Sequence, residues 1–324
     1  RRHDTVLCRR VTCMGVMMKY PKKLNAGDTV GIICPSSAIT TDKVGACIAA
    51  VEAMGFKVKA ADNLDTNYAG YMAGDGKVRG EWINRMFADP EVKGIFCVRG
   101  GDGGSRAMEY IDYEIVKNNP KIFVGYSDVT SMHLAFTQKC DLITFHGPRV
   151  SSNRVSAFDA ETKASFFKAI DAEKDFAFEN PQGMPLEVLK EGKAEGRLTG
   201  GNLSLLSASI GTPYSLDAKG KILFIEEVCE PITKIEKWMY HLRNAGKLAE
   251  CSGILFGQFT QITLDDPVYD LKACMLDILR GIDIPVMYHI QSGHGKPMMT
   301  LPMGAICRID TANRTISFAV EQDL

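Results

Sequence analysis

Short apolar runs alternate with amphipathic helical patterns along the chain from Asp28 onward. Thr29–Cys34 is an apolar run of strand length, and Thr41–Met54 carries apolar residues at helical spacing. The pattern continues with strands near Phe56–Ala60, Gly94–Val98, Lys121–Gly125 and Leu142–Phe145, and with helices near Val78–Phe87, Ser105–Ile111 and Val129–Lys139. Strands that alternate with helices predict βαβ units, and therefore an α/β fold with a mainly parallel sheet covered on both faces.

A chain of 324 residues is long for a single core and favours two domains. The strand and helix signals weaken between about Arg149 and Arg197 and resume with Gly196–Asn202. The predicted division is an N-terminal domain at 19–150, a linker region at 151–195 and a C-terminal α/β domain at 196–324. Residues 1–18 are interpreted as an extension or a vector-derived segment, with the natural start at Met17 or Met18.

The composition indicates an ordinary protein of a reducing compartment. A formal net charge of −1, from 38 basic and 39 acidic residues, gives no electrostatic reason to expect nucleic acid or a membrane surface as partner. No apolar stretch approaches the roughly 18–20 residues of a membrane-spanning helix. The ten cysteines form no C-x-x-C pair, and several lie within apolar runs. We therefore expect buried free thiols, a cytoplasmic location and no zinc site.

The turn Gly125-Tyr-Ser-Asp128 joins an apolar strand to a helix. A sharp turn of this kind, with a glycine two positions before the serine, is the setting of a nucleophile elbow. The backbone N–H after Ser127 would then point at a developing oxyanion, helped by the helix dipole. The alternative is that Ser127 or Asp128 only caps the helix, and the turn alone favours capping.

A second candidate is the glycine-rich loop Arg99–Gly104, which also follows a strand. Glycines let backbone N–H groups approach a bound anion closely, so the loop suits either an oxyanion or a phosphate. The spacing does not match G-x-G-x-x-G, and no Lys-Ser/Thr pair of a P-loop follows. Ligands bind at the carboxyl ends of parallel strands, where this loop and the Ser127 turn would both lie.

An activated serine needs a base and a carboxylate that orients it. Among six histidines, His146 ends a strand of the first domain, and His294 lies in a glycine-flanked loop. Position in the sequence does not choose between them. Glu226 and Glu227 leave an apolar strand of the second domain, so their involvement requires a site between the two domains.

Eight blocks in this order resemble the LD-carboxypeptidase family of serine peptidases. They are Gly27–Ser37, Arg99–Gly101, Gly125–Asp128, His146–Pro148, Gly200–Ser204, Gly211–Tyr214, Ile225–Glu227 and Gly293–Gly295. The resemblance runs from about Leu24 to Asp310. It implies a flavodoxin-like N-terminal domain, a smaller α/β C-terminal domain and a homodimer, with no cofactor and no metal.

By motif position, the resemblance implies a catalytic triad of Ser127, Glu226 and His294. The oxyanion hole maps onto the backbone N–H groups of Gly101 and Asp128. Arg99, Gly100 and Asn202 are expected to bind substrate.

The implied reaction is hydrolysis of the L,D amide bond of a murein tetrapeptide, a small peptide substrate, with release of the terminal D-alanine in cell-wall recycling. The free carboxylate of such a substrate needs a donor set, for which Arg99 and Arg149 are both candidates. Asp102 stands where the family usually has a tyrosine, which affects the expected substrate preference.

Two alternatives are kept. One is a microcin-immunity type of peptidase that cleaves peptidyl- or aminoacyl-nucleotides. The absence of Trp and Tyr between Arg149 and Arg197 weighs against the adenine stacking that this activity favours. The other is a non-catalytic nucleotide- or sugar-binding module in which Ser127 is a helix cap.

Overall fold

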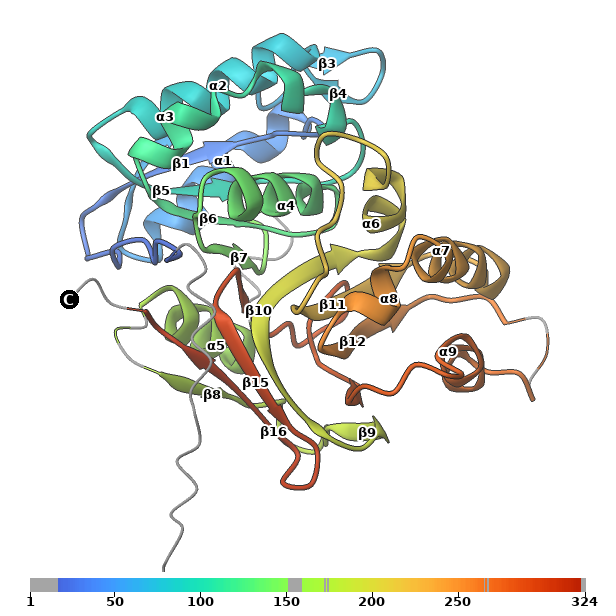
Figure 1. Ribbon diagram of the computed structural model, residues 1–324. Coiled ribbons are helices and arrows are strands. Elements are labelled where there is room, and N and C mark those ends of the chain that lie inside the picture. Colours follow the sequence, from blue (N-terminus) through green and yellow to red (C-terminus); the bar gives the residue numbers. More distant parts are fainter. Residues whose placement is uncertain are drawn as a thin grey trace, which may run out of the picture.

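The computed structural model describes residues 17–150, 159–171, 173, 175–264, 266 and 268–321. Its strands form a six-stranded sheet and an eight-stranded sheet, here called the N-terminal and C-terminal sheets, besides one small hairpin. Figure 1 shows the N-terminal sheet with its helices in the upper part of the molecule and the C-terminal sheet below it. The hairpin, β3 (Asn67–Tyr68) with β4 (Met72–Ala73), lies at the upper end.

The N-terminal sheet contains five parallel strands that alternate with helices. They are β1 (Thr29–Ile33), β2 (Lys57–Ala60), β5 (Val92–Cys97), β6 (Ile122–Gly125) and β7 (Thr144–His146). Their spatial order is β2-β1-β5-β6-β7, the 2-1-3-4-5 order of flavodoxin-like sheets. The predicted flavodoxin-like α/β fold is therefore confirmed.

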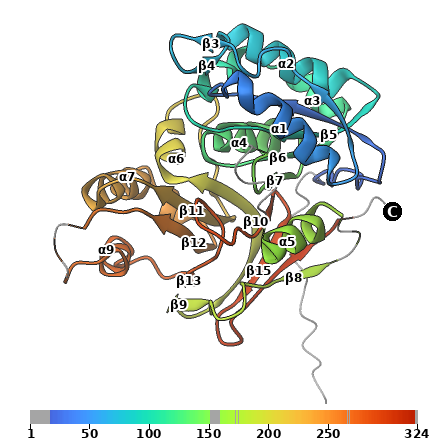
Figure 2. The same cartoon turned by 180° about the vertical axis from the view of Figure 1, so that it is seen from behind.

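Helices cover both faces of this sheet, as its apolar strands require. They are α1 (Thr41–Glu52), α2 (Gly76–Ala88), α3 (Tyr113–Asn118) and α4 (Thr130–Lys139). Helix α4 lies toward the viewer in Figure 1, whereas α1 lies toward the viewer in the reverse view of Figure 2. Because both faces are covered, the inner strands are largely apolar, and Ile122–Gly125 is buried at every residue, whereas the edge strand β2 is exposed or half-buried throughout.

The C-terminal sheet has a parallel centre with antiparallel strands on both sides. Its strands are β8 (Phe176–Phe178), β9 (Glu187–Lys190), β10 (Lys193–Asn202), β11 (Ile222–Val228), β12 (Gly253–Thr260), β13 (Val286–Tyr288), β15 (Ile306–Asp310) and β16 (Thr315–Ala319). Strands β10 to β13 are parallel, and the order is β8-β16-β15-β10-β11-β12-β13-β9. Its helices are α6 (Leu203–Ser209), α7 (Ile232–Asn244), α8 (Lys247–Glu250) and α9 (Leu271–Ile278).

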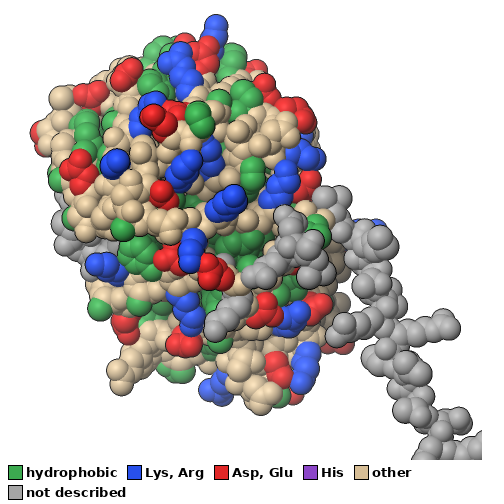
Figure 3. All heavy atoms as spheres, turned by 90° about the vertical axis from the view of Figure 1, so that its left-hand side faces the viewer, with side chains coloured by type: hydrophobic (Ala, Val, Ile, Leu, Met, Phe, Trp, Pro, Cys, Tyr) green, Lys and Arg blue, Asp and Glu red, His purple; other side chains and the backbone are tan. Residues whose placement is uncertain are grey.

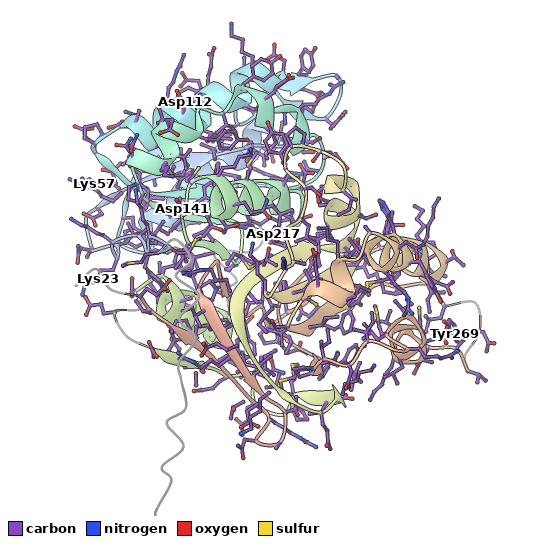
Figure 4. All side chains as sticks on the ribbon, in the orientation of Figure 1. Lys23, Lys57, Asp112, Asp141, Asp217 and Tyr269 are labelled. Carbon is purple, nitrogen blue, oxygen red and sulfur yellow. The ribbon has the colours of Figure 1, made fainter. Side chains whose placement is uncertain are left out.

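The two sheets are joined by more than the chain connection. Strand β14 (Leu301–Met303) leaves the C-terminal region and pairs antiparallel with β7, at the edge of the N-terminal sheet. On α4, the Gln138 side chain accepts from the Asp217 backbone N–H at 2.9 Å and donates to the Ser215 carbonyl at 3.2 Å. Figure 4 shows the labelled Asp217 in this region, below α4.

Some elements differ from the sequence prediction. The segment expected as a helix at Ser105–Ile111 forms two 3₁₀ turns, η1 (Gly104–Arg106) and η2 (Met108–Tyr110). The adjoining Gly103 has a φ of 98°, a left-handed conformation that does not continue into an α-helix. Gly196–Asn202, expected to reopen the second domain, is the end of the ten-residue strand β10.

The domain boundaries stay predictions. The segment predicted as a linker region, 151–195, contains α5 (Ala160–Ile170) and the strands β8 and β9, while residues 151–158 lie outside the described residues. Residues 1–16 of the expected extension also lie outside them, and Met18 is buried in the core of the N-terminal sheet.

The surface agrees with the near-zero net charge. On the face shown in Figure 3, basic and acidic side chains lie interspersed. None of the helices in the part of the chain that the structure describes is long and apolar enough to cross a membrane.

Replacing Phe136 by alanine should destabilise the N-terminal core. The Phe136 ring is fully buried on α4, with its centroid 5.0 Å from that of Phe123 and 5.5 Å from that of Phe87. Loss of a buried phenylalanine costs about 3–5 kcal/mol because a cavity remains. We expect the urea unfolding midpoint to fall accordingly, whereas Leu276→Ala, at a 40% exposed site on α9, should change it little.

Acid should weaken the fold through His133, which is buried on α4. Its Nε2–H donates to the Gly125 carbonyl at 2.9 Å, and its Nδ1 accepts from the Thr144 hydroxyl at 2.8 Å. Burial lowers the pKa of His133 to about 4. Below its ordinary pKa of about 6.5, the unfolded chain binds a proton that the folded chain does not, so stability falls as the pH drops through this window.

Within this window, we expect the free energy of unfolding to change by about 1.4 kcal/mol per pH unit for this one proton. Urea unfolding of the wild type and of His133→Gln, measured between pH 4 and 7, checks it. Equal slopes for the two proteins would contradict the assignment.

Candidate active site

Ser127 lies on a strained turn directly after β6. Its φ is 66°, a left-handed conformation that is unusual for a residue with a side chain, and it opens the 3₁₀ turn η3 (Ser127–Val129) that leads into α4. Strain of this kind is typical of functional sites and of nucleophile elbows. Gly125 permits the turn, because a Cβ there would lie 2.8 Å from Cγ1 of Val129.

Helix capping does not account for this serine. The N-cap of α4 is Val129, which makes no side-chain cap hydrogen bond. The Asp128 carboxylate accepts instead from the backbone N–H of Gly104, at 2.6 Å, and burial raises the pKa of Asp128. Within the described residues, the Ser127 hydroxyl has no hydrogen-bond partner, and its side chain is only half-buried.

The glycine-rich loop packs directly against the serine turn. A Cβ on Gly100 would lie 3.0 Å from Cβ of Ser127 and 3.4 Å from its Oγ. The next residue, Gly101, has a φ of 93°, and a Cβ there would lie 2.3 Å from Oγ of Ser37. The same Ser37 hydroxyl accepts from the Asp102 N–H at 3.0 Å. Gly101 has to be glycine, and a side chain on Gly100 would crowd Ser127, so backbone N–H groups can lie beside the serine.

Glu226 and His294 form a hydrogen-bonded pair. His294 Nδ1 lies 2.7 Å from Glu226 Oε2. The His294 side chain is 10% exposed and the Glu226 side chain 0%. The carboxylate accepts a hydrogen bond from Nδ1–H, so the neutral ring has its lone pair on Nε2, as a general base requires. The other oxygen, Oε1, has no hydrogen-bond partner among the described residues.

A break in the pairing of β11 with β12 occurs at Glu226. Ile225 pairs with Phe256 and Glu227 with Phe259, so Gly257 and Gln258 lie opposite the single residue Glu226. Bulges often re-aim side chains beside active sites. Here the irregular stretch also carries Gln258, which contacts the His294 loop.

Gln258 holds the loop of His294 through both ends of its amide. Its Oε1 accepts from the Gly295 N–H at 2.7 Å, and its Nε2 donates to the Pro297 carbonyl at 3.0 Å. Its backbone N–H donates to the Ser292 carbonyl at 2.8 Å. The position of His294 is therefore fixed from β12 as well as by Glu226.

Tyr126 connects this pair with the serine turn. Its ring centroid lies 4.8 Å from that of His294 in an edge-to-face arrangement, and Tyr126 directly precedes Ser127. The Arg149 guanidinium lies 5.2 Å from the centroid of the same ring. The C-terminal His294 therefore packs against the N-terminal turn that carries Ser127.

His146 lies near Tyr126 and His294, but its burial and its hydrogen bonding differ from those of His294. It is fully buried, and neither ring nitrogen has a hydrogen-bond partner among the described residues. Burial, followed by the neighbouring His133 and His294, keeps the pKa of His146 well below its usual range. Its ring lies edge-on to Phe224, at 5.0 Å between centroids.

The residues expected to bind substrate have contacts within the protein. The Arg99 guanidinium donates to the Ala38 carbonyl at 2.6 Å. The Asn202 amide donates to Glu227 Oε1 at 2.7 Å. Gly100 lies against Ser127, as described above.

Tyr126 and Gln258 belong to the surroundings of the site, although no local sequence pattern marks them as functional. Tyr126 was visible as the residue before the serine, whereas Gln258 lies in an ordinary apolar strand pattern. Across the ranges that the structure describes, no group of three or more His, Cys, Asp and Glu side chains is arranged to hold a metal ion.

Comparisons with known proteins extend over both sheets. Residues 30–147 match the LD-carboxypeptidase N-terminal domain, and residues 195–309 match the LD-carboxypeptidase C-terminal domain. The chain is 38% identical over 299 residues to a probable murein peptide carboxypeptidase of Bacillus subtilis, covering 91% of this chain and 92% of that protein.

Two solved structures are similar over almost their full length. A muramoyltetrapeptide carboxypeptidase from Oxalobacter formigenes superposes with a TM-score of 0.80 at 25% identity, covering 91% of this chain and 99% of that one. The microcin C7 self-immunity protein MccF, in complex with aspartyl sulfamoyl adenosine, gives a TM-score of 0.87 at 26% identity, covering 94% and 99%. The chain therefore belongs to the LD-carboxypeptidase family of serine peptidases.

Proposed function

We propose that the protein is a serine LD-carboxypeptidase that releases the terminal D-alanine from a murein tetrapeptide, with Ser127, Glu226 and His294 as its catalytic triad. The observation that carries the proposal is the pair of His294 and the buried Glu226, 2.7 Å apart, packed through Tyr126 against the turn of Ser127. The relative from Bacillus subtilis, a probable murein peptide carboxypeptidase, supports the substrate class.

The reaction follows the acyl-enzyme route. His294 Nε2 takes the hydroxyl proton of Ser127 as Oγ attacks the carbonyl carbon of the L,D amide. Glu226 keeps the imidazole in the required tautomer and stabilises the imidazolium. His294 then protonates the departing amine of D-alanine, and a water molecule, activated in the same way, hydrolyses the ester.

The backbone N–H groups of Gly101 and Asp128 are the proposed oxyanion donors. The Gly100–Gly101 segment lies against Ser127, and Asp128 follows it at the start of η3. None of the hydrogen bonds between described residues uses the Gly101 N–H. Donors fixed in this way stabilise developing negative charge without reorganising.

The remaining expectations are proposals of the same kind. Eight cysteines in the described part of the chain form no disulfide bond, and seven of them are buried, which supports a cytoplasmic location. The homodimer is a prediction that light scattering after size-exclusion chromatography would test. Arg99 and Arg149 both stay candidates for binding the substrate carboxylate.

A second candidate function is cleavage of a peptidyl- or aminoacyl-nucleotide. It is favoured by the similarity to MccF, whose structure holds aspartyl sulfamoyl adenosine. Parallel assays on a murein tetrapeptide and on an aminoacyl sulfamoyl adenosine, with product analysis, distinguish the two. Preferential turnover of the nucleotide would replace the murein substrate and keep the triad.

Replacing Ser127 by alanine should abolish catalysis without unfolding the protein. We expect D-alanine release to fall by about 10⁴–10⁶-fold, since the nucleophile acts as a unit with its base. A fluorophosphonate should label the wild type and leave the variant unlabelled. Near-normal release by Ser127→Ala would contradict the proposal, and an unlabelled wild type would favour a non-catalytic nucleotide- or sugar-binding module.

The two histidines near the serine should respond differently to substitution. We expect His294→Ala to lose acylation, because only His294 has a carboxylate partner. His146→Phe should retain it, because the buried His146 ring makes aromatic packing contacts and no hydrogen bond among the described residues. Fluorophosphonate labelling rates of both variants, with thermal unfolding as a check on folding, test this choice. Loss of labelling only in His146→Phe would reverse it.

A further inference from the structure

One residue of the C-terminal sheet lies beside Glu226 and also contacts the helix that follows Ser127. Asn202 ends β10, where it is the register partner of Glu226 on β11. Its backbone N–H donates to the Thr130 hydroxyl at 3.0 Å. Thr130 is the first residue of α4 and lies three positions after Ser127. This hydrogen bond therefore links the helix that follows the Ser127 turn to the strand beside Glu226.

The Asn202 side chain is held by a buried carboxylate. Glu227 is 2% exposed, and its Oε1 accepts from the Asn202 amide at 2.7 Å. The same carboxylate accepts from the backbone N–H groups of Val228, at 2.9 Å, and Ser204, at 2.8 Å. The Ser204 hydroxyl donates to Asn202 Oδ1 at 2.6 Å. Both ends of the amide are therefore engaged, and a buried, charge-assisted network of this kind is rigid.

The adjacent side chains of Glu226 and Glu227 on β11 point to opposite faces of the strand. Successive side chains of a strand alternate in direction, so Glu226 reaches His294 while Glu227 reaches Asn202. Burial raises the pKa of Glu227, and the three N–H donors oppose that effect by favouring the ionised form.

The contact with Thr130 depends on a close approach of the backbone. Gly201 has a φ of 138°, and a Cβ there would lie 2.5 Å from the Thr130 hydroxyl. A glycine is therefore required for β10 to come near enough to α4 for the Asn202 N–H to reach its acceptor.

We propose that Thr130, Asn202 and Glu227 act as positioning residues that set the distance between Ser127 and the pair of Glu226 and His294. This inference rests on the proposed function. Thr130 begins the helix three positions after Ser127, whereas Asn202 and Glu227 lie in the C-terminal sheet, where they adjoin Glu226 in register and in sequence. A displacement of about 1 Å between reacting groups can cost on the order of 100-fold in rate.

The sheets are also held together elsewhere, so removing this contact need not unfold the protein. Strand β14 pairs with β7, and Gln138 bonds both to Ser215 and to Asp217. The positioning network differs from these contacts because it links the first residue of α4, three positions after Ser127, to the strand that carries Glu226.

The test compares Thr130→Val, which removes the acceptor, with Thr130→Ser, which keeps it. We expect kcat on the murein tetrapeptide to fall about 10–100-fold in Thr130→Val with KM nearly unchanged, as for an interaction that matters in the transition state. The rate of fluorophosphonate labelling should fall in parallel, and Thr130→Ser should restore both. Gln138→Leu is the matched control, since it lies on the same helix and between the same sheets, and it should retain wild-type kcat.

If Thr130→Val does not fold, Glu227→Gln tests the same network, because it weakens the carboxylate that holds Asn202. Wild-type kcat and labelling in a folded Thr130→Val would overturn the inference while leaving the triad intact. So would equal losses in Thr130→Val and Gln138→Leu, or a Thr130→Ser as slow as Thr130→Val. An unlabelled, inactive wild type would instead overturn the proposed function itself.

Discussion

The hydrogen bond between His294 and Glu226 is the interaction on which the arrangement of the site depends. A fully buried carboxylate is costly unless it is paired, and Oε1 of Glu226 has no partner among the described residues. The bond to His294 Nδ1 therefore both offsets the burial of Glu226 and fixes which ring nitrogen is free to act as a base.

Several features exist to bring that pair to the serine. The break in β11–β12 pairing places Gln258 against the His294 loop, and Tyr126 supplies an aromatic contact between that histidine and the nucleophile turn. The strain at Ser127 is tolerated because β6 and α4 hold the two ends of the turn and the glycine-rich loop packs against it. The site thus lies where two separately organised sheets meet, which is a common place for ligand sites.

The fold was predictable where local patterns are strong. Apolar strands alternating with helices predicted the parallel N-terminal sheet, because strand and helix periodicities are local properties. The apolar spacing of Ser105–Ile111 predicts a helix, but the segment forms two 3₁₀ turns. The left-handed backbone of Gly103, just before them, does not continue into an α-helix. The sequence does not predict strand β14. It has only three residues, and its one pairing partner, β7, lies more than 150 positions earlier in the chain.

By itself, the sequence determined the α/β class and the strand-to-helix turn of Ser127, and its ordered blocks carried the resemblance to the LD-carboxypeptidases. The local sequence does not decide whether Ser127 is a helix cap or a nucleophile. It also does not decide whether His146 or His294 is the base. The tertiary structure has a physical difference that supports the proposed choice in each case. The serine side chain caps no helix, His146 is enclosed without a polar partner, and His294 meets a carboxylate 68 positions away. Such distinctions depend on burial and on long-range contacts, which arise only when the two sheets pack together.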